Sequence, residues 1–286
     1  MLVRLAALAT AAALALGGCS PAESDPTEEQ SSEQQGQSGG QSGDQSGEQS
    51  GEETETIEAP EPGVCRVLEP ADIAEASNDT EPVDCAEPHN AETFLVASFG
   101  DELADAEYDD ERQGQVVYDR CTKGFMKFTG ANESLALRSV LSWAWWRPTQ
   151  EEWDAGARWF RCDVVGGTDQ SAELVELPET AKGVLLGIPG DRWMSCVQGD
   201  SVSGVPPVPC TEPHDWRAVT TIVVGQEKDK YPGDRLVEVL SRDYCSDSVG
   251  AWMNYPVDYE FAYTWFHKAE WEAGNRRSIC WAGTKE

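Results

Sequence analysis

The chain carries a long internal repeat, and this duplication constrains its fold more than any other feature of the sequence. The segment Glu152–Cys162, which contains Glu-Trp-x-Ala-Gly-x-Arg and a following cysteine, recurs as Glu270–Cys280. Upstream, the motif Cys-x-Glu-Pro-His occurs at Cys85–His89 and again at Cys210–His214. The copies keep the same order and lie 118 to 125 residues apart. Motifs repeated in constant order mark a repeated structural unit, so we expect two similar units.

Eight of the nine cysteines follow the repeat, four in each copy. They are Cys65, Cys85, Cys121, Cys162, Cys196, Cys210, Cys245 and Cys280. Even numbers at repeated spacings in an exported chain indicate disulfides rather than free thiols. Four cysteines allow three pairings; we favour first with second and third with fourth in each repeat. No C-x-x-C or H-x₃-H spacing occurs, so we expect no metal and no cofactor.

A helical pattern supports the pairing of the third cysteine with the fourth. A helix is predicted after Pro232–Asp234, with Leu236, Leu240 and Tyr244 spaced at i, i+4. The cysteines lie on an apolar face of their helices, with the members Cys121, Phe125 and Phe128 in repeat one and Cys245, Val249 and Trp252 in repeat two. A cysteine that faces the core can meet Cys162 or Cys280 on the sheet beneath it.

The remaining patterns predict strands. The segments 92–99 and 218–224 each follow a Cys-x-Glu-Pro-His motif, and the alternation of Tyr259, Phe261, Tyr263 and Trp265 is typical of a half-buried strand. Repeat one keeps this phase from Leu135 to Trp145. The Glu-Trp-x-Ala-Gly-x-Arg segment predicts a helical turn that ends near its glycine. The predicted fold is therefore α+β, with two disulfide-stapled repeats, each a mostly antiparallel sheet with one packed helix.

We place the two repeats at residues 61–170 and 188–286, with a linker running roughly from Gly166 to Pro189. Within it, Leu177–Ala181 resembles a sortase-type sorting motif. The apolar tail and basic end that such a signal needs do not follow, and more than 100 residues lie downstream. We therefore expect this pentapeptide to be part of the linker.

The N-terminal residues 1–19 have the features of a secretory signal. Arg4 precedes an Ala/Leu run, which ends in Leu16-Gly17-Gly18-Cys19. This ending resembles a bacterial lipoprotein lipobox, which implies lipidation of Cys19 and a chain anchored to the cell membrane on its outer side. Residues 20–60 contain no aromatic residue, Lys or Arg, and predict a disordered acidic Gly/Ser/Gln linker.

The charge of the chain excludes one class of partner. Removing the eleven acids of residues 20–60 and Arg4 from the formal charge of −31 leaves −21 for residues 61–286. Without a basic patch to neutralise phosphates, we expect no nucleic acid partner. The acidic balance is typical of a well-solvated surface.

Two sets of repeated residues are candidates for a site. The first comprises Trp153, Gly156, Arg158, Trp271, Gly274 and Arg276. Each arginine could stack on a tryptophan or bind Glu152 or Glu270, and we favour such a structural clamp over binding of an anionic ligand. The second set is His89 and His214, which we expect to be structural, because no nucleophile motif accompanies them. His267 has no evident counterpart in repeat one, and we expect it to be a surface or packing residue.

The order of these motifs resembles the septum formation domain of actinobacterial envelope lipoproteins, in two copies. The resemblance covers most of residues 61–286 and includes Pro148–Trp153. The family often has Asp before the arginine, where this chain has Ala157 and Asn275. The resemblance implies division or envelope work, and no catalytic residues carry over from it.

Two functional hypotheses follow. The first is a non-catalytic, lipid-anchored extracytoplasmic protein that binds an envelope protein or a cell-wall component during septum formation or envelope growth. The alternative is an envelope hydrolase that uses His89 or His214 with a neighbouring carboxylate. A histidine that lines a cleft beside a carboxylate would favour the enzyme, whereas buried histidines bonded only to backbone would favour the first hypothesis.

Overall fold

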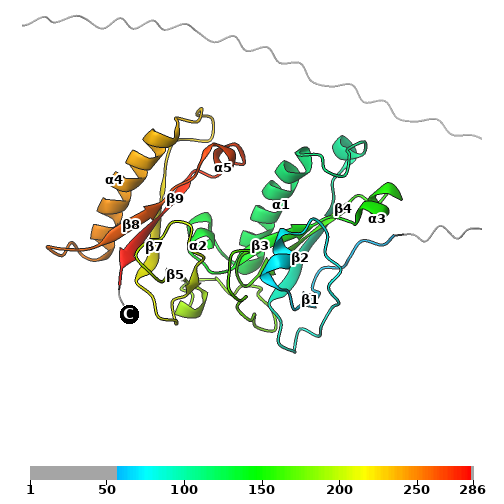
Figure 1. The fold of residues 1–286 in the computed structure, drawn as a ribbon, viewed down its shortest axis with the longest axis horizontal. Helices are drawn as coiled ribbons and strands as arrows, with labels where there is room; N and C mark the ends of the chain where they lie inside the picture. The colour runs from blue at the N-terminus through cyan, green and yellow to red at the C-terminus, as the bar shows by residue number, and fades with distance from the viewer. Residues whose placement is uncertain (1–56, 285–286) are drawn as a thin grey trace, which may run out of the picture. The chain divides into compact units, whose positions relative to one another are not determined.

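The computed structural model describes residues 57–284, so Cys19 and most of the predicted linker 20–60 lie outside the described residues. The described chain forms two antiparallel sheets, each packed against one long helix (Figure 1). The first sheet has the order β1-β2-β4-β3, with β1 (Cys65–Arg66), β2 (Ala91–Ser98), β3 (Ser142–Trp146) and β4 (Trp159–Val165). The second has the order β6-β5-β7-β9-β8, with β5 (Ser195–Val197), β6 (Val208–Pro209), β7 (Trp216–Val223), β8 (Phe261–Thr264) and β9 (Arg277–Gly283). This is the predicted α+β class.

Long and short helices alternate with these strands. The long helices are α1 (Arg112–Thr129) and α4 (Asp234–Trp252). The short α-helices are α2 (Glu133–Leu137), α3 (Gln150–Asp154) and α5 (Lys268–Glu272). Three 3₁₀ turns complete the set: η1 (Pro70–Ala74), η2 (Asp101–Leu103) and η3 (Asp191–Trp193).

The two sheets share the same irregularity in strand register. In the first sheet the pairing of β2 with β4 shifts between Thr93 and Leu95, and Leu95 faces Cys162. In the second sheet the pairing of β7 with β9 shifts at the corresponding point, and Thr220 faces Cys280. Because the β-bulge lies at the same point in both sheets, the residues of β2 and β4 can be matched one to one with those of β7 and β9.

Four disulfides staple the repeats, two in each. They are Cys65–Cys85, Cys121–Cys162, Cys196–Cys210 and Cys245–Cys280. These are the pairings that the sequence analysis favours. In each repeat one bridge joins the long helix to the central strand, and the other closes the loop between the first strand and the Cys-x-Glu-Pro-His turn.

The long helices bury the apolar stripe that carries the cysteine, but not every apolar residue of the predicted helical patterns. In α4 the buried positions include Val237, Cys245 and Val249, whereas Leu236 and Tyr244 are about half exposed, at 48% and 49%. Successive side chains of an α-helix point about 100° apart. Leu236 and Tyr244 each precede a buried residue by one position, so their side chains turn toward solvent. Trp252, the last residue of the helix and a member of the predicted apolar face, is also half exposed.

The predicted strand from Leu135 to Trp145 is wrong in its first half. Residues Glu133–Leu137 form α2, and the strand begins only at Ser142. The side chain of Asn132 accepts a hydrogen bond from the Leu135 N–H at 2.9 Å and so caps the helix. An N-cap asparagine followed by an acidic first turn stabilises a helix, and this local signal outweighs the alternating leucines.

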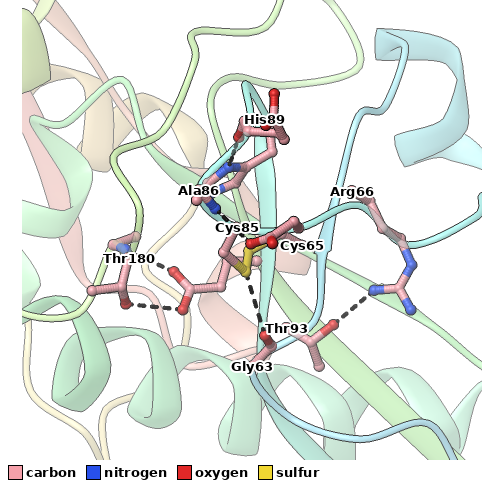
Figure 2. The surroundings of a disulfide bond; sticks show 12 residues. Gly63, Cys65, Arg66, Cys85, Ala86, His89, Thr93 and Thr180 are labelled. Atoms are coloured by element: carbon pink, nitrogen blue, oxygen red, sulfur yellow. Dashed lines mark hydrogen bonds between the residues drawn. A yellow bond between two sulfur atoms is a disulfide. The ribbon is translucent and has the colours of Figure 1, made fainter.

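The predicted linker between the repeats is instead a packed part of repeat one. We call residues 177–185 the covering segment. Its Leu177, Ala181 and Leu185 are buried in a core cluster that also contains residues of β4 and α1. The buried Glu92 of β2 accepts hydrogen bonds from the Thr180 hydroxyl at 2.9 Å and the Ala181 N–H at 2.6 Å. Figure 2 shows Thr180 beside this carboxylate, next to the Cys65–Cys85 bridge.

The same core cluster continues into repeat two. It includes Leu141 of repeat one together with Met194, Cys196 and Cys210 of repeat two. Backbone hydrogen bonds cross at the same place, because Ser195 N–H donates to the Arg138 carbonyl at 2.8 Å. The described residues of the two repeats therefore share buried surface.

Candidate functional site

The Trp-x-x-Gly-x-Arg motif folds in the same way in both repeats. The guanidinium carbon of Arg158 lies 4.1 Å from the centre of the Trp153 ring, and Nη1 donates to the Trp153 carbonyl at 2.7 Å. Arg276 lies 3.6 Å from the ring of Trp271 and donates to the Trp271 carbonyl. Each arginine is thus held by stacking and by backbone hydrogen bonds within its own repeat. This is the structural clamp predicted from the motif.

The glycine of the motif ends the short helix that carries the tryptophan. Gly156 and Gly274 have φ angles of 105° and 106°. Their N–H groups donate to the carbonyls of Trp153 and Trp271, both at 3.0 Å. Only glycine adopts this backbone region without strain, so the motif requires it for a geometric reason.

The glutamates of the motif cap the helices instead of binding the arginines. Glu152 accepts a hydrogen bond from the Thr149 N–H at 2.7 Å, and Glu270 accepts one from the His267 N–H at 2.8 Å. Both pairs belong to capping boxes. His267 therefore does have a counterpart in repeat one, namely Thr149, and the contrary expectation is wrong. The residue types differ, yet both residues cap a short helix together with a glutamate three positions later.

The two candidate histidines are buried and bonded to backbone. Nδ1 of His89 lies 2.8 Å from the Glu87 carbonyl oxygen, and Nδ1 of His214 lies 2.8 Å from that of Glu212. Because a carbonyl only accepts, each Nδ1 carries the proton, and each ring fixes its own Glu-Pro-His turn. Each Nε2 is buried and has no hydrogen-bond partner among residues 57–284. Within the same residues, no carboxylate is hydrogen-bonded to either ring.

A buried ionic cluster, which was not predicted from the sequence, lies on the face of the first sheet opposite α1. Asp163 is fully buried, and one of its carboxylate oxygens is 3.6 Å from Arg66 Nη1 and 3.6 Å from Arg161 Nε. Arg66 also donates to the Thr93 hydroxyl at 2.9 Å, as Figure 2 shows. Arg161 lies 4.7 Å from the ring centre of Trp146. The signal was present in the sequence, since charged residues flank Cys162 in an otherwise apolar strand.

Burial governs the ionisation of this cluster. Desolvation lowers the pKa of Arg161 to about 10, against the opposing effect of Asp163. Desolvation also raises the pKa of the Asp163 carboxyl, while Arg161, Thr93 and Arg66 act to lower it. Charges removed from water are costly unless they are paired, so each member depends on the others.

Repeat two has an apolar cluster in the same place. By strand register, Val197, Ala218, Ile279 and Trp281 correspond to Arg66, Thr93, Arg161 and Asp163. Val197, Ala218 and Trp281 form a buried cluster against which Ile279 packs. The same sheet position is therefore ionic in one repeat and apolar in the other, which indicates that the charges are not required by the fold.

Within residues 57–284, no group of three or more His, Cys, Asp or Glu side chains is arranged to hold a metal ion. No helix in this part of the chain is both long and apolar enough to cross a membrane.

Comparison with known families identifies the repeat. The family model for septum formation matches the chain twice, at residues 31–147 and 138–280. The first match begins among residues that the structure does not describe and ends just after β3, and the second contains β4 and nearly all of repeat two. These bounds differ from the predicted repeats at 61–170 and 188–286. No curated protein and no solved structure matches the chain.

The family connects the chain with septum or envelope formation and with an envelope or extracytoplasmic location. Because the two matches together span residues 31–280, the chain belongs to the septum formation family, with two copies of its domain.

Proposed function

We propose that this protein is a non-catalytic lipoprotein, anchored through Cys19 to the outer side of the cell membrane. Its two repeats act as binding or scaffolding units in septum formation or envelope growth, with an envelope protein or a cell-wall component as partner. One observation carries the non-catalytic part of the proposal. The repeated residues that could perform chemistry, His89, His214, Arg158 and Arg276, are all engaged in contacts within their own repeat. His214 also lines a surface hollow, but no carboxylate among residues 57–284 is hydrogen-bonded to its ring.

The sequence at the N-terminus supports the anchor. An apolar run that ends in Leu-Gly-Gly-Cys at Cys19 is typical of lipoproteins, and residues 20–60 are long enough to hold the repeats away from the membrane. The eight other cysteines are paired, so Cys19 is the one cysteine left for another role.

The anchor is tested by substituting Cys19→Ser and growing cells with an alkyne-tagged fatty acid. The wild-type protein and a matched control, Ser20→Ala, should carry the tag and sediment with membranes. The Cys19→Ser protein should carry no tag and leave the membrane fraction. A tagged Cys19→Ser protein would show that the anchor lies elsewhere.

The non-catalytic role is tested by complementation of a deletion strain. The double variant His89→Gln/His214→Gln keeps an N–H donor for each glutamate carbonyl, so it should fold and restore septation as the wild type does. Loss of complementation would favour the hydrolase if the thermal unfolding curve and the set of cross-linked partners were both unchanged. Cross-linking in living cells followed by mass spectrometry then identifies what the anchored protein contacts, with the Cys19→Ser chain as the control.

A further inference from the structure

The covering segment lies on a defined surface of repeat one. Leu177 N–H donates to the His89 carbonyl at 2.8 Å, and Gly183 N–H donates to the Phe128 carbonyl at 2.8 Å. Between these contacts Glu92 binds Thr180 and Ala181, as described above. Repeat one thus has a surface that holds an extended peptide with apolar side chains, and the chain itself supplies that peptide.

The corresponding surface of repeat two carries no such extended segment among the described residues; α2 of repeat one and residues 187–189 border a hollow there instead. Arg217 faces Ala282, two residues beyond Cys280, as Glu92 faces Val164, two residues beyond Cys162. Trp252 follows Cys245 by seven residues, as Phe128 follows Cys121. Arg217, Trp252 and His214, the counterpart of His89, all line one hollow of about 430 Å³. A hollow of this volume is within the usual range for ligand sites. The described chain places no backbone N–H on the His214 carbonyl.

The charge of the surface differs between the repeats. Where repeat one has a carboxylate, the hollow has two arginines, Arg138 and Arg217. Arg217 pairs with Asp191, whereas Arg138 donates to the carbonyls of Ser134 and Val219 and has no carboxylate partner among the described residues. Burial, and then the charge of Arg217, lowers the pKa of Arg138. Of the two arginines, Arg217 thus has a carboxylate counterion, whereas the half-buried Arg138 has none among residues 57–284, although the chain has more than twice as many acids as bases.

Apolar side chains complete the hollow. Leu135 and Met194 are buried in its lining, Trp252 is half exposed, and Ile188 is almost fully exposed beside it. Apolar walls around a few placed polar groups are typical of sites that bind an organic ligand.

We propose that this hollow binds an extended peptide segment of another protein, which carries an acidic side chain for Arg138 and Arg217 and apolar side chains for Leu135, Met194 and Trp252. The covering segment binds repeat one in the same way. The difference is that repeat one presents the carboxylate of Glu92 where repeat two presents the guanidinium of Arg217. The inference concerns the hollow alone and requires neither the lipid anchor nor a septal role.

The test uses fluorescent peptides with the sequence of residues 177–185. In one peptide Asp replaces Thr180, and in a matched peptide Asn replaces Thr180. Anisotropy is measured with the full-length Cys19→Ser chain, which avoids competition by acyl chains and detergent. The Asp peptide should bind about ten-fold more tightly than the Asn peptide, as expected for a charge-assisted hydrogen bond. This preference should disappear in Arg217→Gln and Arg138→Gln.

Two controls keep the result interpretable. Arg242→Gln removes an exposed arginine on α4, outside the hollow, and should keep the ten-fold preference. Since Arg138→Gln also removes a hydrogen bond between the repeats, Ile188→Asp provides an independent variant: it changes a fully exposed side chain and should weaken the Asp peptide several-fold. Three results would overturn the proposal: no saturable binding at millimolar peptide, equal binding of both peptides, or a preference that survives both arginine substitutions.

Discussion

The buried Arg66–Asp163–Arg161 cluster gives the sharpest prediction of stability. The substitution Asp163→Ala leaves two guanidinium groups with 6% and 4% of their side chains exposed and no carboxylate between them. Breaking a buried ion pair by removing one partner typically costs about 3–5 kcal/mol, because the remaining charge is uncompensated. We expect a loss of that size for Asp163→Ala, since both arginines depend on this single acid.

The apolar counterpart in repeat two predicts the outcome of removing all three charges. In the triple variant Arg66→Met/Arg161→Met/Asp163→Leu, no charge remains to be compensated. Replacement of a buried ionic group by packed apolar side chains is often neutral, or stabilising by about 1–4 kcal/mol. The triple variant should therefore be at least as stable as the wild type, and far more stable than Asp163→Ala alone.

The assay is urea unfolding with the disulfides intact, followed by tryptophan fluorescence and by near-ultraviolet circular dichroism. Asp243→Ala, which breaks an exposed ion pair with Arg242, is the control. It should leave the urea midpoint unchanged within experimental error. The reasoning would be refuted if Asp163→Ala cost less than about 1 kcal/mol, below the range for buried pairs. It would also be refuted if the triple variant were as unstable as the single one.

Three further predictions concern the repeated motifs. Replacing both cysteines of the Cys121–Cys162 bridge by Ala should cost about 4 kcal/mol on the chain-entropy model for a separation of 41 residues, measured by urea unfolding; no loss would contradict a structural bridge. Arg158→Gln should cost about 1–2 kcal/mol, because it removes the stacking on tryptophan and the backbone hydrogen bonds, and an unchanged midpoint would count against the clamp. Gly156→Ala should cost about 1–3 kcal/mol from its φ angle alone, since no atom lies within 4 Å of an added Cβ. By contrast, Gly114→Ala in α1, with equally open space, should stabilise by about 0.5–1 kcal/mol, and a similar loss at both positions would refute the argument.

The features that the sequence predicts well are those set by local chemistry or by the repeat. The start of α4 follows from Pro232–Asp234, and the end of α3 follows from Gly156. The disulfide pairing follows from the helical position of Cys121 and Cys245. Each of these depends on residues close in sequence, or on a pattern that occurs twice.

The features that were missed depend on contacts between distant residues. The covering segment has no periodic pattern, and its role depends on Glu92, a residue 88 positions from Thr180. The ionic cluster joins β1 to β4 and becomes visible only when strand register is known. The exposure of Leu236 and Tyr244 could not be predicted, because two apolar stripes lie side by side on α4 and the sequence does not say which one meets the sheet.

The burial of Leu177 and Ala181, at the two ends of a pentapeptide whose middle residues are exposed, bears on whether enzymes can process this chain internally. A protease or transpeptidase must hold its recognition sequence extended in a catalytic cleft, but here the first residue is 4% exposed and the last is not exposed at all. Cleavage would first require Thr180 and Ala181 to detach from Glu92, and the two buried end residues to leave the interior of repeat one. A pentapeptide that reads as a sorting signal is thus withheld from any sorting enzyme for as long as the domain stays folded.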